Sequence, residues 1–322
     1  MGRPIRVEYP AALYHITSRG NEKKKIFLKD VDRIKFLKIL EDYHDRYGIL
    51  IYCYILMDNH YHLILETPRG NLLKVMHGIN SSYTGYFNRK YGRSGHLFQG
   101  RYKGILVEKD SYLLTLSRYV HLNPVRAGLV ERPEHYRWSS YPGYIGREKE
   151  SSWIEYGWVL SQFGMARKTA QRRYQGYTEE GLKAKEDPPL KNLYGQVVLG
   201  REEFIGKIKG MLKGRRLPRE IVERKRFMES PSPMEVVGVV SEVFRVKREE
   251  ILDRRRSRHR ARKVAIYFCQ RYTGLSNEAI GRLFGGIHYS AVSKVTNRIR
   301  EEILKDKKLS ELVDQVNSHF KA

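Results

Sequence analysis

The chain has 322 residues, and its 61 Lys and Arg against 36 Asp and Glu give a net charge of +25 and a pI of about 9.9. A chain this basic attracts polyanions, and nucleic acid is favoured over an anionic membrane surface. No segment approaches the roughly 20 apolar residues of a membrane-spanning helix, and no signal peptide is expected. Its two cysteines each lie in an apolar run, which excludes a disulfide framework and a Cys-based zinc site. A reduced, cytoplasmic setting is therefore expected.

The first 145 or so residues alternate strand and helix patterns. Strands are predicted at residues 11–18, 49–57, 60–67 and 96–107, and helices at residues 31–47, at 110–122 and from Leu72 to near Gly92. The order strand, helix, strand, strand, helix, strand, plus one further helix, is typical of a ferredoxin-like antiparallel sheet. The predicted fold class is therefore α+β, followed by an all-α region.

The rest of the chain has two parts. Residues 147–232 are rich in charge and glycine, with helices predicted at 167–174 and 201–213, which indicates a connector. Helical patterns resume at Met234 and continue through Phe320. The predicted domains are therefore 1–146, 147–232 and 233–322.

Two histidines lie two residues apart in the strand predicted at 60–67. Because alternate strand residues share a face, His60 and His62 would present two imidazoles side by side. Neutral imidazoles at this spacing can hold a divalent metal. Two ordinary polar residues on the wet face of a strand would give the same pattern.

The helix predicted at 110–122 supplies a possible nucleophile. Tyr119 and Asn123 are i and i+4, and are therefore neighbours on the helix surface. A tyrosine phenolate can attack a phosphodiester and conserve the bond energy in a phosphotyrosine. Its unperturbed pKa of about 10 means that it needs help from a metal. An amide oxygen of Asn123 could complete a His-His-Asn metal set, although a packing tyrosine and a helix-ending asparagine are the common alternatives.

Four motifs in the first 145 residues support this interpretation together. They are residues 14–21 (YHITSRGN), 57–63 (MDNHYHL), 95–103 (GHLFQGRYK), and 112–114 (YLL) with 118–130 (RYVHLNPVRAGLV). In content and order these motifs resemble the single-tyrosine HUH transposases, especially the REP-associated tyrosine transposases. Tyr61 stands where that family has a hydrophobic residue, which is a tolerable departure.

The resemblance implies a Mg²⁺ or Mn²⁺ ion held by His60, His62 and Asn123, and cleavage of single-stranded DNA at a hairpin or repeat element. Tyr119 is the implied nucleophile, and the implied products are a 5′-phosphotyrosine and a free 3′-OH. Tyr112 competes for this role but lies about three helical turns from Asn123. Relatives that dimerise can exchange the tyrosine helix, so a homodimer and a site shared between two chains stay open.

Other residues near the motifs have simpler expected roles. His15, His96 and His121 are expected to be hydrogen-bonding or DNA-facing residues rather than metal ligands. The segment from His96 to Lys103 mixes aromatic and basic residues, which suits single-stranded DNA. Arg101 and Lys103 are therefore predicted DNA contacts, with a solvated basic face as the alternative.

The C-terminal region has the pattern of a helix-turn-helix. A short helix, the turn Gly285-Gly286 and a basic helix from about Ser290 to Leu304 follow an arginine-rich run, and the second helix of such a motif enters the major groove. Residues 260–266 (RARKVAI) and 280–292 (IGRLFGGIHYSAV) resemble the DNA-binding domain of the replication initiator DnaA.

This second resemblance implies binding to duplex DNA. The implied contacts are Arg260, Arg262, Ser290, Ser293, Lys294 and Arg298. The family's Arg-Asp-His-Thr-Thr has become residues 287–291 (IHYSA), so its sequence preference is not carried over. No glycine-rich phosphate loop is present in the sequence, so no ATPase is predicted.

The sequence thus predicts a metal-dependent enzyme that cleaves and rejoins single-stranded DNA through Tyr119 and is tethered to duplex DNA by its C-terminal domain. The first alternative is a non-catalytic DNA-binding regulator derived from such an enzyme. An HUH replication initiator or relaxase and an RNA-binding protein are the others.

Overall fold

The computed structural model describes residues 7–183, 189–195, 197–212, 231–253, 259–273, 275 and 277–320. The chain divides into two compact units, one with residues 6–189 and one with residues 190–322. This division differs from the three domains predicted from the sequence, because residues 147–189 belong to the first unit.

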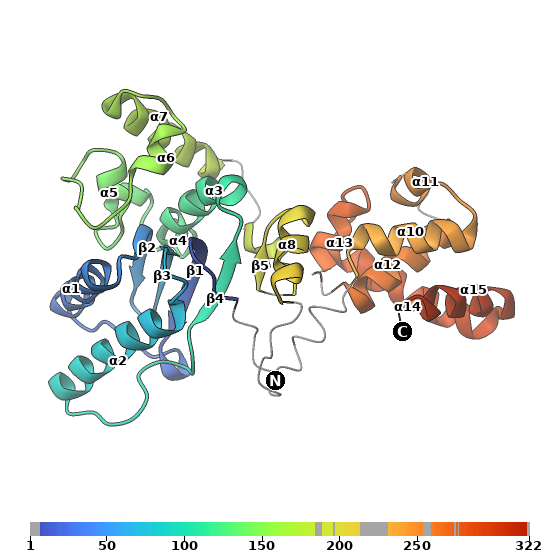
Figure 1. The fold of residues 1–322 in the computed structure, drawn as a ribbon, viewed down its shortest axis with the longest axis horizontal. Coiled ribbons are helices and arrows are strands. Elements are labelled where there is room, and N and C mark those ends of the chain that lie inside the picture. Colours follow the sequence, from blue (N-terminus) through green and yellow to red (C-terminus); the bar gives the residue numbers. More distant parts are fainter. Residues whose placement is uncertain are drawn as a thin grey trace. The chain divides into compact units, whose positions relative to one another are not determined.

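The first unit is built on an antiparallel sheet (Figure 1). Its first elements are β1 (Ala12–Arg19), α1 (Asp30–Tyr47), β2 (Leu50–Met57), β3 (His60–Thr67), α2 (Leu72–Tyr91), β4 (Lys103–Val107) and α3 (Lys109–His121), with a 3-10 turn at Asn21–Lys23. Strand β1 pairs with β3 and β4, and β3 pairs with β2, so these strands follow the order β2-β3-β1-β4. This order confirms the predicted α+β fold.

Each face of the sheet has its own helices. On β3, the buried ring of Tyr61 contacts Phe36 of α1, and its hydroxyl donates to Asn80 of α2 at 2.6 Å. Because side chains alternate along a strand, His60 and His62 point to the opposite face, the face of Thr17, which is paired with His62 across β1 and β3. Helix α3 packs against β2 and β3 and carries Tyr119 to this second face.

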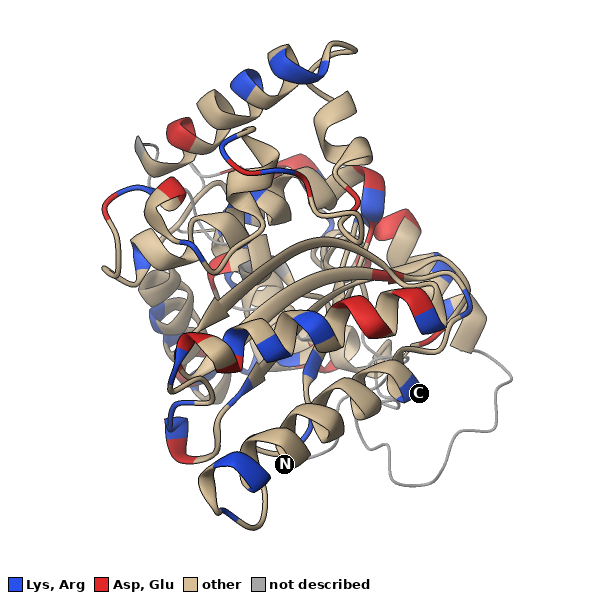
Figure 2. Ribbon diagram, turned by 90° about the vertical axis from the view of Figure 1, so that its left-hand side faces the viewer, with Lys and Arg blue, Asp and Glu red and all other residues tan. Residues whose placement is uncertain are grey.

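Charged side chains are rare on these strands. Strands β1 to β4 hold only Arg19, Glu66 and Lys103, and Figure 2 shows that Lys and Arg are spread over helices and loops instead. None of the helices within the described ranges combines the length and the apolar character needed to cross a membrane.

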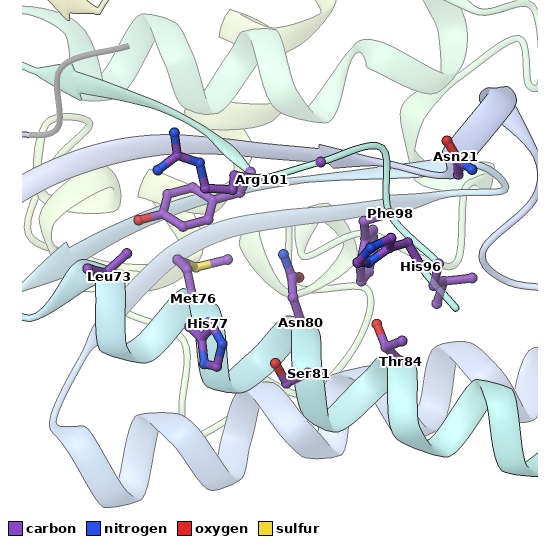
Figure 3. A pocket seen from close by; sticks show the side chains of 13 residues that line it. Asn21, Leu73, Met76, His77, Asn80, Ser81, Thr84, His96, Phe98 and Arg101 are labelled. Atoms are coloured by element: carbon purple, nitrogen blue, oxygen red, sulfur yellow. The ribbon is translucent and has the colours of Figure 1, made fainter. Parts of the chain in front are cut away.

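The strand predicted at 96–107 is shorter than expected. Only Lys103–Val107 forms β4, because Gly95 and Gly100 adopt positive φ angles of 83° and 67° that break an extended run. Residues 97–99 instead bond to the end of β1: Asn21 N donates to Leu97 O at 2.9 Å, and Gln99 N donates to Arg19 O at 2.8 Å. The same segment faces α2 across a cavity (Figure 3).

The remaining helices of this unit pack around α3. They are α4 (Asn123–Arg126), α5 (Tyr141–Tyr144), α6 (Gly157–Ser161) and α7 (Arg167–Lys183), with a 3-10 turn at Pro133–His135. Tyr174 of α7 is buried, its hydroxyl donates to Ser117 Oγ at 3.0 Å, and it lies 2.7 Å from His121 Nδ1. The start of the predicted connector therefore supports the helix that carries Tyr119.

The second unit is mainly helical. Its elements are β5 (Val198–Leu199), α8 (Glu202–Leu212), α10 (Pro233–Phe244), α11 (Arg248–Leu252), α12 (Arg260–Tyr272), α13 (Asn277–Leu283), α14 (Tyr289–Lys305) and α15 (Lys307–Ser318), and a 3-10 turn at Pro189–Asn192 lies at the boundary. A continuous core joins α10 to α15, with buried Val240, Phe268, Phe284 and Ile299 among its residues. Helix α14 confirms the helix predicted from about Ser290 to Leu304.

Candidate active site and nucleic-acid interface

The two histidines of β3 lie side by side at the end of the sheet. Their ring centroids are 5.1 Å apart, and β1 places Arg19 opposite His60 and Thr17 opposite His62. His60 Nδ1 lies 2.7 Å from Asn59 Oδ1. Burial, aided by Arg19, lowers the pKa of His60, and burial lowers the pKa of His62 further. Both imidazoles are therefore neutral at pH 7, which is the state that binds metals.

A third histidine holds His62 in place. His15 Nε2 lies 2.9 Å from His62 Nδ1, the two rings stack with centroids 5.1 Å apart, and Thr17 Oγ1 is 3.2 Å from the same nitrogen. The polar contacts of both β3 histidines thus use Nδ1, which leaves Nε2 of each ring for a cation. The expected hydrogen-bonding role of His15 is confirmed.

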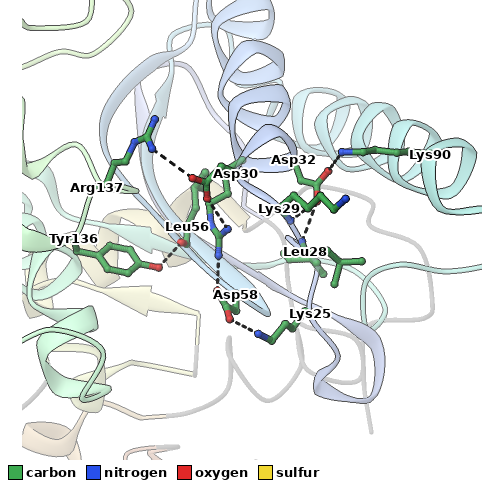
Figure 4. Close-up of polar contacts among 12 residues, drawn as sticks. Lys25, Leu28, Lys29, Asp30, Asp32, Leu56, Asp58, Lys90, Tyr136 and Arg137 are labelled. Atoms are coloured by element: carbon green, nitrogen blue, oxygen red, sulfur yellow. Dashed lines mark hydrogen bonds and ion pairs between the residues drawn. The ribbon is translucent and has the colours of Figure 1, made fainter.

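The turn before His60 is fixed from several sides. Lys25 Nζ lies 2.8 Å from a carboxylate oxygen of Asp58, as Figure 4 shows, and Arg33 of α1 forms an ion pair with the same carboxylate. The Asp58 carbonyl accepts from Ile26 N at 2.8 Å, and Gly20 N donates to the Asn59 carbonyl at 2.8 Å. These contacts hold the β2–β3 connection, and with it the start of β3, in one position.

Tyr119 lies over the histidine face. Its ring is 6.5 Å from that of His15, centroid to centroid, in an edge-on arrangement. The Arg126 guanidinium is 5.0 Å from the centroid of the Tyr119 ring and donates to the Tyr119 carbonyl at 3.3 Å. Burial raises the pKa of Tyr119, although Arg126 acts to lower it. The phenol is therefore protonated at pH 7 and must lose its proton to become a nucleophile.

The predicted third ligand is turned toward its own helix. Asn123 Nδ2 donates to the carbonyls of Tyr119 and Val120, at 3.0 and 3.4 Å. Its Oδ1 is the amide atom that remains for a cation. Tyr112 lies about two turns before Tyr119 on α3. His15 thus contacts both His62, which lies beside His60, and Tyr119. Asn123 is held next to Tyr119 by its hydrogen bond to the Tyr119 carbonyl.

The histidine pair fits a divalent cation in its chemistry, because both rings are neutral and both Nε2 atoms remain for ligation. Among the described residues, no group of three or more His, Cys, Asp or Glu side chains could hold a metal ion. The pair would therefore need oxygen ligands from an amide, water or substrate, which are the ligands that Mg²⁺ prefers.

Helices α13 and α14 of the second unit form the predicted helix-turn-helix. Gly285 and Gly286 make the turn with positive φ angles of 71° and 74°. Ile287 N donates to the Gly281 carbonyl at 2.9 Å, and a Cβ at position 281 would lie 2.2 Å from Ile287 O. Asn277 Nδ2 donates to Ser293 Oγ at 2.9 Å and ties the two helices together.

The predicted duplex contacts divide into two groups. Lys294, Arg298 and Arg260 are exposed, with Arg260 2.7 Å from Asp306, while Ser290 and Ser293 are half-buried. Arg262, in contrast, is only 2% exposed, and its guanidinium donates to Ile251 O at 2.8 Å and to Phe284 O at 2.6 Å. Its prediction as a DNA contact is wrong, because this face of α12 points into the core. Arg101 and Lys103 of the first unit are exposed.

Two family models match the chain. Residues 9–123 match the family of IS200-like transposases, and residues 233–299 match the bacterial DnaA helix-turn-helix. The chain therefore contains an IS200-like transposase domain, followed by a DnaA-type helix-turn-helix domain.

Curated relatives match about a quarter of the chain. The replication initiator DnaA of Corynebacterium jeikeium is 29% identical over 92 residues, 28% of this chain and 16% of that protein. DnaA of Lachnoclostridium phytofermentans is 35% identical over 81 residues, 24% of this chain and 18% of that protein. The chain thus spans less than a fifth of the length of these relatives. Among solved structures, a REP-associated tyrosine transposase bound to a REP hairpin aligns with 46% of this chain and 87% of its own, at 15% identity and a TM-score of 0.40.

Proposed function

We propose that this protein is a divalent-metal-dependent transposase that cleaves and rejoins single-stranded DNA through a covalent bond to Tyr119. Its substrate would be a hairpin or repeat element, and the C-terminal domain would bind neighbouring duplex DNA. The observation that carries the proposal is the contact of His15 with both Tyr119 and His62 on one face of one sheet.

In the proposed reaction, the Tyr119 phenolic oxygen attacks the phosphorus of a phosphodiester and loses its proton. The bond from phosphorus to the 3′-oxygen breaks, and that oxygen takes up a proton to become a 3′-OH. The DNA 5′-phosphate remains on Tyr119. Rejoining is the reverse: a 3′-OH attacks the phosphotyrosine, and the phenol is released.

His60 and His62 would hold the metal through Nε2, with Asn123 Oδ1 as the proposed third ligand. A bound Mg²⁺ or Mn²⁺ would polarise the scissile phosphate and offset the charge that develops on it. The protein's own part is to keep both rings neutral by burial and to hold them in place through His15 and Asn59. Arg126, next to the Tyr119 ring, favours the phenolate.

The test is an oligonucleotide-trapping gel with single-stranded hairpins that carry random flanking bases. We expect a covalent adduct with Mg²⁺ or Mn²⁺, none with EDTA, and none with the His62→Ala protein. If a well-folded wild-type protein binds these hairpins but forms no adduct with either metal, the protein is instead a non-catalytic DNA-binding regulator.

The duplex-binding part of the proposal rests on the DnaA-type domain and its exposed cations on α14. Its second helix carries Lys294 and Arg298 on a surface that can meet phosphates. Duplex binding with a steep salt dependence is expected, since phosphate contacts release counterions.

A further inference from the structure

The cavity between α2 and residues 96–102 lies outside the histidine site (Figure 3). Its volume is about 630 Å³, within the roughly 300–1,000 Å³ typical of small-ligand pockets. Leu73, Met76, His77, Asn80, Ser81 and Thr84 come from one stripe of α2, and Asn21 and residues 96–98 and 100–102 come from the opposite wall. We propose that this cavity binds an unstacked base of the DNA substrate; the inference rests on the proposed function in taking DNA as the ligand.

The walls suit the flat faces of a base. Met76, Leu97, Phe98 and Tyr102 are all less than 10% exposed and form the apolar part of the lining. A base that has left its stack gains free energy by packing on such apolar and aromatic groups. Nothing about the walls requires a particular base.

Asn80 provides a hydrogen-bond donor for the edge of a base. The buried Tyr61 hydroxyl donates to Asn80 Oδ1 at 2.6 Å. This contact fixes the amide, and Asn80 Nδ2 has no hydrogen-bond partner in the described part of the chain. Ser81 and Thr84 add hydroxyl groups on the same helix.

The position of the cavity relates it to DNA at the histidine pair. Tyr61, which holds Asn80, stands between His60 and His62. Gln99 bonds to Arg19 at the end of β1, and Leu97 bonds to Asn21 just beyond it; Arg19 lies opposite His60. A strand held at the histidines can therefore pass this end of the sheet and place a nearby base in the cavity.

Exposed cations mark both sides of this route. Arg101 lines the cavity, and Lys103 is paired with Thr17 on the histidine face of the sheet. Arg19 is also exposed, and it lies opposite His60 on β3. Within the described residues, none of these three side chains forms an ion pair, so each can meet a phosphate.

Ser81→Leu tests the proposal, because Ser81 is exposed and lines the cavity whereas its neighbour Ser82, also exposed, does not. Binding is measured in EDTA, in the Tyr119→Phe background, with fluorescent dT12, dA12, and a twelve-unit abasic deoxyribose-phosphate chain. We expect Ser81→Leu to weaken dT12 or dA12 binding by roughly five- to a hundredfold, the loss of one stacked base. The abasic chain should bind both variants equally, and Ser82→Leu should bind all probes like the parent.

A Thr84→Leu variant repeats the test from a second position in the cavity. If neither Ser81→Leu nor Thr84→Leu weakens either base-containing probe, or if both weaken the abasic chain equally, the cavity does not bind a base. If the two variants lose as much affinity for the matching oligoribonucleotide as for the DNA probe, the cavity binds a base and accepts RNA as well as DNA. A protein that keeps cavity-dependent binding but forms no adduct in the trapping gel would refute the proposed function and leave this inference standing.

Discussion

His15 connects the two halves of the candidate site at the scale of single residues. Its ring lies between Tyr119 of α3 and His62 of β3. If His62 binds a cation through Nε2, its Nδ1 carries a proton and donates a hydrogen bond to His15 Nε2. His15 Nδ1 is then protonated, and this buried atom has no partner among the described residues. His15 is therefore a positioning residue that selects the tautomer of His62.

Replacing His15 should weaken metal binding. We expect His15→Ala to lower the Mn²⁺ affinity of the protein by roughly 10- to 100-fold, as loss of an outer-shell partner commonly does. Titration calorimetry without DNA measures this directly. His319→Ala is the control, because His319 is exposed and belongs to the second unit. An unchanged affinity in His15→Ala would show that His62 needs no support.

Substitution of Arg262 should change stability, whereas substitution of Arg298 should change DNA binding. Arg262→Met leaves two buried carbonyls without a donor and should lower the free energy of unfolding of the C-terminal unit by about 2–5 kcal/mol. Arg298→Ala should leave stability unchanged and reduce the salt dependence of duplex binding by about one counterion. Urea unfolding and fluorescence anisotropy at several salt concentrations separate the two effects. A stable Arg262→Met protein with weakened DNA binding would contradict this assignment.

Helix α3 depends on its neighbours for its position, and His121 is the main polar connection. His121 is fully buried, with Nδ1 2.7 Å from Tyr174 Oη of α7 and Nε2 2.9 Å from Ser140 Oγ. Ser140 in turn lies against β2, because its Oγ accepts from Tyr54 N at 3.1 Å. One neutral imidazole thus ties α3 to a second helix and to the sheet edge.

The burial of these histidines makes stability depend on pH. Burial lowers the pKa of His121 and of His15 to about 3, against about 6.5 in an unfolded chain. Below pH 6.5 the unfolded chain takes up protons that the folded unit cannot. The free energy of unfolding should therefore decrease as the pH is lowered below about 6.5, by up to about 1.4 kcal/mol per pH unit for each histidine.

Urea unfolding at pH 7.5, 6.5 and 5.5 checks this dependence. His121→Gln removes one titrating group and keeps hydrogen-bonding capacity, so it should show a shallower loss between pH 6.5 and 5.5 than wild type. Equal losses in the two proteins would mean that His121 is protonated in the folded state or contributes nothing.

Sequence patterns predicted elements better than irregular segments. The apolar stripe of α2 predicted that helix nearly to the residue, because burial on one face imposes the helical period, and the strand predicted at 60–67 has the bounds of β3. The strand predicted at 96–107 was wrong for residues 96–102. Gly100 in this segment has a positive φ angle, which a periodic pattern of apolar residues does not predict. The prediction of Arg262 as a DNA contact was wrong for a related reason, because a run of charged residues does not show which of them faces the core.

The candidate site was predictable in its residues but not in its connections. The spacing of His60 and His62 and the position of Tyr119 were readable from the chain. Their connection through His15 was not, because it depends on the pairing of β1 with β3, 47 residues apart at this contact. The i, i+4 spacing predicted that Tyr119 and Asn123 are neighbours on a helix. It did not predict that Asn123 Nδ2 donates to the Tyr119 carbonyl.

At the scale of the whole molecule, one chain supplies both the histidines and the tyrosine. The His15–Tyr119 ring contact lies within a single chain, so we expect each chain to act alone. A mixture of Tyr119→Phe and His62→Ala proteins should then form no DNA adduct. The trapping gel with the mixed and the separate proteins measures this. Recovery of an adduct in the mixture would instead indicate exchange of α3 between two subunits.

The account as a whole depends on Tyr119 being the residue that becomes linked to DNA beside the histidine pair. The most direct measurement is mass spectrometry of peptides from protein incubated with Mn²⁺ and hairpin-bearing single-stranded DNA. We expect the nucleotide on the peptide that contains Tyr119, its retention in Tyr112→Phe, and its loss in Tyr119→Phe. A nucleotide on Tyr112, or an adduct that persists in Tyr119→Phe, would contradict the account.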